Sequence, residues 1–454
     1  MNEPSQNPSP FTFSRRGFLR TTGGAMAGGA LLGALSPERF AHAASGTDEI
    51  KIALIGCGGR GSGAANQALS TYPLGPVKLV AVADVHEDRL KGSLANLQKE
   101  HGARVDVPAE RQFMGFDAYK KAIETCDVAI LTTPPGFRPM MFEEAVKQGK
   151  NVFMEKPVAS DAAGVRQVLA AAAEAKKKNL KVGVGLQRHH QTGYIETVKR
   201  IYDGQIGDVT AMRCYWNGNR PWQMKRADLE KKYGRKLTEM EYQLRNWYYF
   251  TWIGGDHIVE QHIHNIDVIN WIKKGPPVKA HAMGGREFNN GGADDGEIFD
   301  HFAIEFEYAD GSICNSFCRH QPVPDWNSVS ESVIGTKGKC DVNGYKIFGE
   351  NQWRFKPEGD AKPKDPYQQE HDDFFAAIRD NKEYSEAEYG ASSTMTAILG
   401  RMAAYSGKSI EYKAGLESKI ELLPQELGWD KPSRVNPGPD GMYQRAIPGK
   451  TVVV

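Results

Sequence analysis

Residues 50–61 read Ile-Lys-Ile-Ala-Leu-Ile-Gly-Cys-Gly-Gly-Arg-Gly, and a segment typical of a helix, Ala64–Ser70, follows. A glycine loop between a buried strand and a helix is the phosphate-binding turn of a dinucleotide-binding Rossmann domain. Gly56 permits the tight turn, Gly58 lets a pyrophosphate approach the backbone, and Gly61 lets helix and strand pack closely. The alternative is an ordinary glycine turn. The context of strand and helix favours dinucleotide binding, with free N–H groups of the helix N-terminus facing the phosphates.

A second apolar run, Val77–Ala83, ends at Asp84, about 20 residues past the loop, where an acidic side chain binds the ribose of a dinucleotide. A carboxylate there accepts a hydrogen bond from the 2′-hydroxyl and repels a 2′-phosphate. The sequence therefore predicts NAD rather than NADP as the cofactor, and we also place Gly59 and Arg60 of the loop in its site.

Two further apolar runs, Val128–Leu131 and Asn151–Met154, predict buried strands. The first runs into a Thr-Thr-Pro-Pro loop and the second into a Glu-Lys-Pro motif. Ligands of open α/β sheets bind at the carboxyl ends of the strands. We therefore expect the following residues to contact the cofactor as well: Thr133, Pro134, Glu155 and Lys156.

The glycine loop, the Thr-Pro-Pro loop, the Glu-Lys-Pro motif at 155–157 and a His-x-x-Asp motif at 264–267 together resemble the Gfo/Idh/MocA superfamily. The superfamily takes its name from glucose–fructose oxidoreductase, inositol dehydrogenase and rhizopine catabolism. The resemblance runs from about Ile50 to about Tyr412. It implies an α/β fold: an N-terminal Rossmann domain with a doubly wound parallel sheet, and a C-terminal α/β domain with a large, open, mostly antiparallel sheet.

The hydrophobic pattern agrees with this architecture. After the run Lys181–Leu186, strand-like segments alternate between apolar and polar residues, as in Phe302–Tyr308 and Ser312–His320, which indicates an antiparallel sheet with one exposed face. We expect four parts: an export signal at 1–43, the NAD-binding domain at 48–186, the substrate and catalytic domain at 187–422, and an extended arm rich in Pro and Gly at 423–454.

The segment Gly254–Trp271 carries the predicted catalytic groups. Glu260 and His264 are spaced i, i+4 and would share one face of a helix, with Asp267 further along the same stripe. Oxidation of a carbinol needs a base for the hydroxyl proton, a charge that stabilises the alkoxide, and a hydride acceptor. An imidazole suits the first role, a lysine the second and NAD the third.

The resemblance implies that Lys156 reaches the substrate oxygen and that His264 accepts the proton. The family often has Asp where this chain has Glu260, so this carboxylate could orient the substrate or His264, or bind another hydroxyl. Alternatively, Lys156 is an ordinary surface residue and the histidines form a structural network. A metal site of His257, Glu260 and His264 would spread over two turns of one helix; we predict no metal.

Substrate contacts are predicted in two further places. Gln187, Arg188 and His189 follow the last Rossmann-type strand, where a surface loop is the alternative. The stretch 217–252 is rich in charged and aromatic residues, and we select its Arg245 and Trp247, because rings stack on sugar C–H faces; core aromatics are the alternative. Asp267 completes the predicted substrate set.

The N-terminal residues have the features of an export signal. Ser14-Arg-Arg-Gly-Phe-Leu-Arg20 precedes a mildly apolar run, Thr21–Leu35, and the small-residue site Ala41-His-Ala43. The paired arginines resemble the twin-arginine signal. We expect this machinery to export the folded protein, with a periplasmic or otherwise exported destination and no stable membrane anchor, since the apolar run is short and rich in Gly. An unstructured basic terminus is the alternative.

The composition indicates which kinds of binding partner to expect. The 57 Lys and Arg residues nearly balance 56 Asp and Glu residues, so nothing indicates nucleic acid or an anionic membrane as partner. The six cysteines lack any CxxC or zinc spacing and are predicted to be small core residues. We expect a homo-oligomer that acts on a small molecule.

The leading functional hypothesis is an NAD-dependent oxidoreductase acting on the CH–OH group of a sugar, polyol or sugar derivative. An exported protein has no free nicotinamide pool, so the cofactor would be held tightly and recycled. A second hypothesis is glycoside cleavage through transient oxidation, elimination and re-reduction. A third is a binding protein without catalysis, against which the presence of both Lys156 and His264 argues.

Overall fold

The structure is a computed structural model, and it describes residues 49–287, 292–321, 326–357 and 363–454. The predicted export signal at 1–43 lies outside the described residues. The described chain contains two sheets, one of six strands and one of nine.

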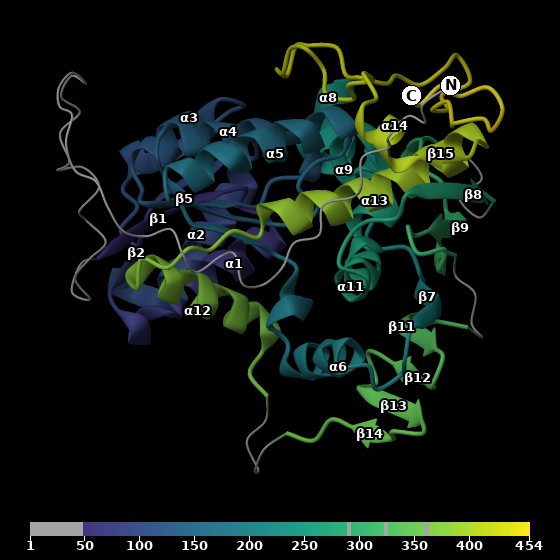
Figure 1. Cartoon of the computed structure of the whole chain (residues 1–454). Coiled ribbons are helices and arrows are strands. Elements are labelled where there is room, and N and C mark those ends of the chain that lie inside the picture. Colours follow the sequence, from purple (N-terminus) through teal and green to yellow (C-terminus); the bar gives the residue numbers. More distant parts are fainter. Residues whose placement is uncertain (1–48, 288–291, 322–325, 358–362) are drawn as a thin grey trace, which may run out of the picture. The chain divides into compact units, whose positions relative to one another are not determined.

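The first sheet is the predicted doubly wound Rossmann sheet. Its strand order is β3-β2-β1-β4-β5-β6, and every pair in it is parallel. The strands are β1 (Ile50–Ile55), β2 (Val77–Asp84), β3 (Gln112–Met114), β4 (Val128–Leu131), β5 (Asn151–Met154) and β6 (Val182–Val184). Its helices are α1 (Gly59–Leu69), α2 (Glu87–His101), α3 (Ala118–Glu124), α4 (Arg138–Lys147) and α5 (Ala162–Lys177). Figure 1 shows α3, α4 and α5 on one face, with α1 and α2 on the other.

Both faces of this sheet are buried, which explains the continuous apolar runs in the sequence. Along β1, Ala53 and Ile55 belong to the core under α3, α4 and α5, whereas Ile52 and Leu54 belong to the core under α1 and α2. Helix α1 begins at Gly59, earlier than the apolar pattern indicated, because the glycine loop itself forms the first turn.

The second sheet has the order β14-β13-β12-β11-β7-β10-β9-β8-β15. All its neighbouring pairs are antiparallel except β7 and β10, which run parallel, so the prediction of a large, mostly antiparallel sheet is confirmed. The strands are β7 (Val209–Gly218), β8 (Lys279–Gly285), β9 (His301–Glu307), β10 (Ile313–His320), β11 (Ser328–Gly335), β12 (Gly338–Asp341), β13 (Lys346–Gly349), β14 (Trp353–Arg354) and β15 (Ile410–Glu411).

The remaining helices belong to the second half of the chain. They are α6 (Thr192–Tyr202), α7 (Arg226–Tyr233), α8 (Glu239–Arg245), α9 (Thr251–Gly254), α10 (His257–Glu260), α11 (Ile263–Lys273), α12 (Pro366–Arg379), α13 (Ala387–Ser406) and α14 (Tyr412–Leu416). Helix α13 packs against both α5 and β8. Helix α12 returns to the first sheet, where Phe374 and Phe375 join the core under α1. The domain limits at 186 and 422 therefore stay predictions.

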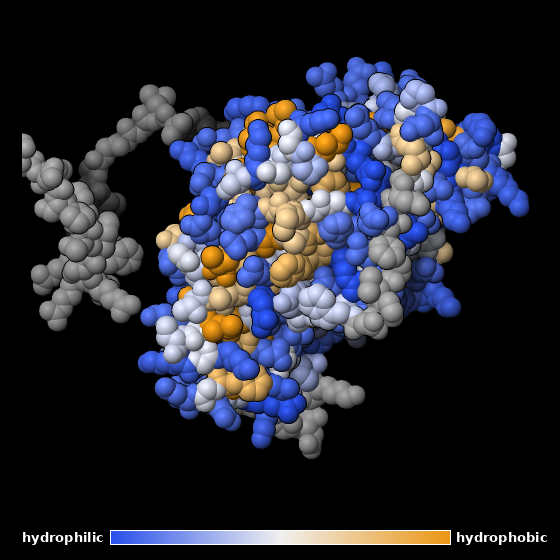
Figure 2. All heavy atoms as spheres, turned by 90° about the vertical axis from the view of Figure 1, so that its right-hand side faces the viewer, coloured by the Kyte–Doolittle hydropathy of each residue, from blue (hydrophilic) through white to orange (hydrophobic). Residues whose placement is uncertain are grey.

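The second sheet leaves one face open. Burial alternates residue by residue along β9 and β10, as a sheet covered on one side requires. Figure 2 looks at the right-hand side of Figure 1 and shows apolar residues gathered among hydrophilic ones. The exposed apolar side chains of this sheet include Met283, Val329, Ile334 and Phe348.

The prediction for the cysteines also has an outcome. All six cysteines are free and buried, as core residues should be. None of the helices in the described part of the chain is both long enough and apolar enough to cross a membrane. After α14 the described tail contains neither helix nor strand.

Candidate active site

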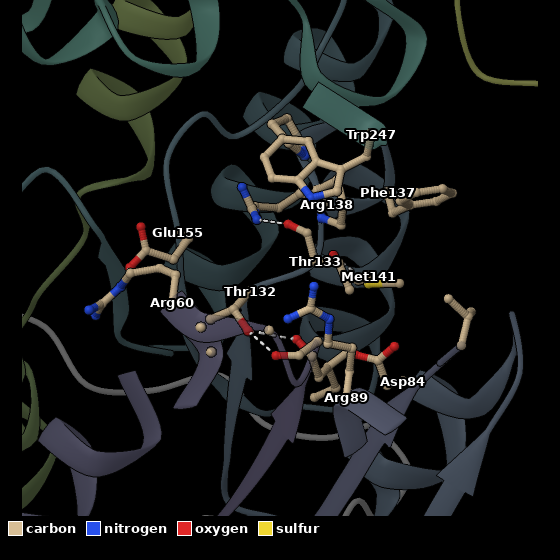
Figure 3. A pocket seen from close by; sticks show the side chains of 18 of the residues that line it. Arg60, Asp84, Arg89, Thr132, Thr133, Phe137, Arg138, Met141, Glu155 and Trp247 are labelled. Carbon is tan, nitrogen blue, oxygen red and sulfur yellow. Dashed lines mark hydrogen bonds and ion pairs between the residues drawn. The ribbon is translucent and has the colours of Figure 1, made fainter. Parts of the chain in front are cut away.

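A cavity of about 530 Å³ opens at the carboxyl ends of the first sheet's strands. The glycine loop, Asp84, the loop after β4 and the Glu155-Lys156 motif form one part of its lining. Residues of β7, α10, α11 and the stretch 217–252 form the other part, of which Figure 3 labels Trp247. The structure thus brings the predicted cofactor residues and Lys156, Glu260 and His264 into one cavity.

The glycine loop has the shape that a dinucleotide needs. Gly56 has φ +95°, and a Cβ there would lie 2.6 Å from the amide nitrogen of Thr133. A Cβ at Gly61 would lie 2.0 Å from the carbonyl oxygen of Gly56. At Gly58 and Gly59, by contrast, nothing lies within 4 Å of an added Cβ. The first two glycines allow close backbone packing, and the other two leave a bare cradle for a pyrophosphate at the start of α1.

Asp84 is fixed by two backbone amides. The N–H of Cys57 donates to one carboxylate oxygen at 2.6 Å, and the N–H of His86 donates to the other at 2.7 Å. Burial raises the pKa of Asp84, and these amide hydrogen bonds oppose the rise. Each oxygen keeps a lone pair for a ribose hydroxyl, so the carboxylate fits the predicted role.

Charged side chains tie the loops of this edge together. Arg60 of the glycine loop pairs with Glu155 at 2.5 Å. The buried Arg138 donates to the carbonyl oxygens of Thr133 and Pro157, joining the loop after β4 to the loop after β5. Burial lowers the pKa of Arg138 to about 10, so it stays charged at neutral pH. These hydrogen bonds and this ion pair therefore hold the loops around the expected cofactor site in fixed positions relative to one another.

Lys156 and Glu260 meet across the cavity. The Lys156 Nζ lies 3.0 Å from Oε1 of Glu260 and 2.5 Å from the carbonyl oxygen of the same residue. An ammonium group has three donors. Glu260 therefore holds the lysine in place while one N–H is left for a substrate oxygen.

His264 is held neutral in the same cavity. Its ring stacks on Trp216 with centroids 5.9 Å apart, and its Nδ1 is buried without a hydrogen-bond partner among the described residues. Burial, followed by the charges of Lys156 and Arg188, lowers the pKa of His264 well below its usual value. An imidazole kept neutral beside an ammonium group can accept a proton from a substrate hydroxyl.

The prediction that one continuous helix carries both Glu260 and His264 is wrong. Helix α10 ends at Glu260, and α11 begins only at Ile263. The N–H of His262 donates to the carbonyl of His257, five residues back, at 3.2 Å, which makes a wider turn. Glu260 and His264 still line the same cavity, together with Gln261 between them.

Other predicted substrate residues lie elsewhere. The following do not line this cavity: Gln187, Arg188, His189 and Asp267. Gln187 donates to the Tyr367 hydroxyl at 3.1 Å, and Arg188 pairs with Glu331. His189 hydrogen bonds to Asp267 at 2.8 Å. These contacts engage most of their polar groups within the protein, although Oε1 of Gln187 is buried without a hydrogen-bond partner among the described residues. Their role in substrate binding stays a prediction.

Arg245 and Trp247 do line the cavity. So do several aromatic residues that the sequence did not single out, among them Trp216, Trp222 and Tyr367. Trp222 belongs to the aromatic stretch already noted. Trp216 lies on a strand of alternating polarity, and the sequence does not show which face of that strand meets the cavity.

No group of three or more His, Cys, Asp or Glu side chains is arranged to hold a metal ion within the described ranges.

Comparison with known proteins identifies the fold's family. Residues 50–185 match the Gfo/Idh/MocA oxidoreductase family, described as having an NAD-binding Rossmann fold, and residues 194–341 match a Gfo/Idh/MocA C-terminal domain. The chain belongs to the Gfo/Idh/MocA family. Its first domain is thus an NAD-binding Rossmann domain, and the cradle at Gly58 and Asp84 fits that cofactor.

Curated relatives of this Gfo/Idh/MocA protein include inositol 2-dehydrogenases. That of Klebsiella pneumoniae (strain 342) is 33% identical over 169 residues, covering 36% of this chain and 45% of the relative. That of Ralstonia nicotianae is 29% identical over 226 residues, covering 49% of this chain and 54% of the relative. The match therefore spans about half the length of these curated relatives.

Solved structures support the fold. The aldose-aldose oxidoreductase of Caulobacter crescentus superposes with a TM-score of 0.61 at 16% identity, over 80% of this chain and 100% of that one. The scyllo-inositol dehydrogenase of Lactobacillus casei, solved with NAD(H) and scyllo-inositol, has a TM-score of 0.58 at 20% identity, over 81% of this chain and 100% of that one. At these identities the likeness shows the fold alone.

Proposed function

We propose that the protein is an NAD-dependent oxidoreductase that transfers hydride between a carbinol of a sugar, polyol or sugar derivative and tightly bound NAD. The observation that carries this proposal is the shared cavity: Lys156 comes from the Rossmann half, His264 from the second half, and both line the space next to the cofactor cradle. A neutral base and a fixed cation are the two protein groups that carbinol oxidation needs.

The residues divide the work as follows. NAD, when bound, supplies the hydride acceptor. Lys156, held by Glu260, donates a hydrogen bond to the substrate oxygen and stabilises its negative charge as the proton leaves. His264 accepts that proton, and its ring is kept in orientation by Trp216. In the reverse direction the same imidazole returns the proton.

The residues that line the cavity favour a ring-shaped polyol or sugar as the substrate. Trp216, Trp222 and Trp247 line the same cavity as the proposed catalytic groups, and such rings stack on the C–H faces of sugars. The curated relatives named inositol 2-dehydrogenase point to the same class of compound.

A substrate panel tests this proposal. The purified protein, loaded with NAD, is mixed with myo-inositol, scyllo-inositol, aldoses and nitrophenyl glycosides, while the absorbance of reduced nicotinamide and released nitrophenol are both followed. The proposal requires that at least one polyol or sugar reduces the bound NAD. Release of nitrophenol without lasting NAD reduction would instead support glycoside cleavage, and the absence of both signals in a fully loaded protein would contradict enzymatic function.

The neutral state of His264 gives a pH prediction. Because the pKa of His264 lies well below its usual value, its base form persists when the pH falls to ~6.5, the ordinary pKa of histidine. The rate of NAD reduction by substrate is therefore expected to stay level from neutral pH down to ~6.5 and to decline only at lower pH. Single-turnover rates over a pH series measure this; a decline centred at or above the ordinary value would argue against a buried neutral base.

We further propose that the protein is exported through the twin-arginine machinery. The support is the sequence alone: Arg15-Arg16 before Gly-Phe-Leu, then a mildly apolar run and the small-residue site at Ala43. Such a route carries a folded chain, so a protein that collects its cofactor before export suits it.

Replacement of both arginines tests the export proposal. The variant Arg15→Lys/Arg16→Lys is expected to accumulate in the cytoplasm as a folded, full-length precursor, because the paired guanidinium groups are what the machinery reads. Cell fractionation and immunoblotting measure the location, with Arg20→Lys as the matched control. Normal processing of the double variant would overturn the proposal.

A further inference from the structure

One wall of the active-site cavity belongs to neither sheet. Residues 219–250, which we call the cover segment, follow β7 and contain α7 and α8. Four of its side chains line the cavity: Trp222, Leu244, Arg245 and Trp247. The cover segment thus forms one layer of the wall of this cavity, and Figure 3 shows its Trp247 among the lining side chains.

An ion pair fastens the cover segment to the Rossmann domain. Arg245 donates to both carboxylate oxygens of Asp88, in the first turn of α2, at 2.7 and 3.0 Å. Lys232 lies 3.6 Å from the same carboxylate. Burial alone would raise the pKa of Asp88, but the hydrogen bond and charge of Arg245 lower it to about 2. The planar, two-point geometry of this pair fixes the position of the segment and not only its charge.

The C-terminal tail adds a second layer. The ring of Trp429 lies 5.7 Å from that of His86 and packs edge-on against Phe116 at 5.0 Å. His86 and Phe116 both line the cavity. The tail therefore packs against two residues that line the cavity, His86 after β2 and Phe116 after β3.

The tail is also bound to the cover segment. Gln243 donates to Ser433 Oγ at 3.0 Å and to the carbonyl of Val435 at 2.7 Å. Further along the tail, Tyr443 donates to Glu239 at 2.5 Å and accepts from Arg226 at 3.0 Å. Movement of the cover segment away from the Rossmann domain would therefore have to disturb the tail as well.

The position of this double layer relative to the cofactor follows from the cradle. In a Rossmann domain the glycine loop would hold the pyrophosphate and Asp84 the ribose, so the adenine would be held beyond Asp84, where His86 and Phe116 line the cavity. We propose that the cover segment and the tail together enclose the adenosine half of NAD, so that the dinucleotide stays bound between turnovers. Its exit then requires the Arg245–Asp88 pair to open and the contacts of Trp429 to loosen. This inference rests on the proposed tight binding of NAD and names the residues responsible.

The rate of cofactor release tests the inference without any substrate. The protein is loaded with NADH and diluted into excess NAD, and the loss of bound-NADH fluorescence gives the release rate. The variants Asp88→Ala and Trp429→Ala are each expected to release NADH roughly tenfold faster than the wild type, because contacts that close a complex act mainly on its dissociation rate. The matched control is Asp106→Ala, which removes an exposed ion pair with Arg111 in the same domain and should leave release unchanged.

One further measurement and one further variant show whether faster release reflects only a loss of folding. Thermal unfolding of each variant shows whether the fold is kept, and Asp88→Asn, which keeps the size of the side chain, covers the case in which the alanine variant unfolds. Release as slow as in the wild type from both Asp88→Asn and Trp429→Ala would overturn the inference. That result would leave the proposed carbinol chemistry intact, and an inactive substrate panel would conversely leave the release prediction standing.

Discussion

Replacing His264 with alanine is expected to slow the reduction of bound NAD by substrate about 10²- to 10⁴-fold, the usual cost of losing a general base. The proposed function assigns the role of base to this imidazole, whose pKa burial and the nearby Lys156 keep low. The fold should persist, because the ring donates to and accepts from no other described residue, and NAD binding should persist, because the glycine loop and Asp84 are untouched.

The measurement is the single-turnover rate of NAD reduction, with His281→Ala as control. His281 is a half-exposed histidine on β8, paired with Glu305 at 2.9 Å and absent from the cavity lining. The control should react like the wild type. A wild-type rate for His264→Ala would show that His264 is not the proton acceptor. Glu260 would then be the next candidate, since the neighbouring His262 is directed at Ser316 at 2.7 Å.

Replacing Lys156 with alanine is expected to cost about two to three orders of magnitude in the same rate, as removal of one preorganised charge-stabilising donor does. A second effect identifies the lysine's place more sharply. The charge of Lys156 helps to lower the pKa of His264, so its removal should raise that pKa and move the acid limb of the rate profile to higher pH. Loss of rate without such a shift would mean that the two groups do not share the site.

The control for this variant is Lys177→Ala, at the exposed end of α5, which should change neither the rate nor the pH profile. Glu260→Gln separates the remaining possibilities. If the carboxylate only holds Lys156, the amide keeps a hydrogen-bond acceptor for it and the loss should be milder than that of Lys156→Ala. A loss as large as that of His264→Ala would make Glu260 the base.

The fold was predictable because its signals are local. Short segments were enough to predict the first domain: the apolar strand Ile50–Ile55, the glycine loop after it, and Asp84. The alternation of apolar and polar residues along β9 and β10 predicted an antiparallel sheet with one covered face. Helix boundaries were less certain. The start of α1 lies within the glycine loop, where low helix propensity hides it from any apolar pattern.

The site was predictable only in part, for a different reason. Lys156 and His264 stand in short motifs, whereas the walls around them depend on contacts between distant segments. Nothing in the sequence shows that Arg245 pairs with Asp88 or that Trp429 packs on Phe116, since each pair joins residues far apart in the chain. For the same reason, the position of His189, stacked between Trp271 and Tyr389, could not be read from its place after a strand.

The central claim is that a carbinol hydrogen passes directly to the bound NAD, and deuterium tests it most directly. The most active compound of the substrate panel is supplied with deuterium on its carbinol carbon, and the nicotinamide is then released by denaturation and examined by mass spectrometry. The account predicts one deuterium on the reduced nicotinamide in the wild type, a slower single turnover than with the protiated compound, and neither transfer nor turnover in Lys156→Ala/His264→Ala. Reduced nicotinamide without deuterium, or no reduction by any polyol or sugar in a fully loaded protein, would contradict it.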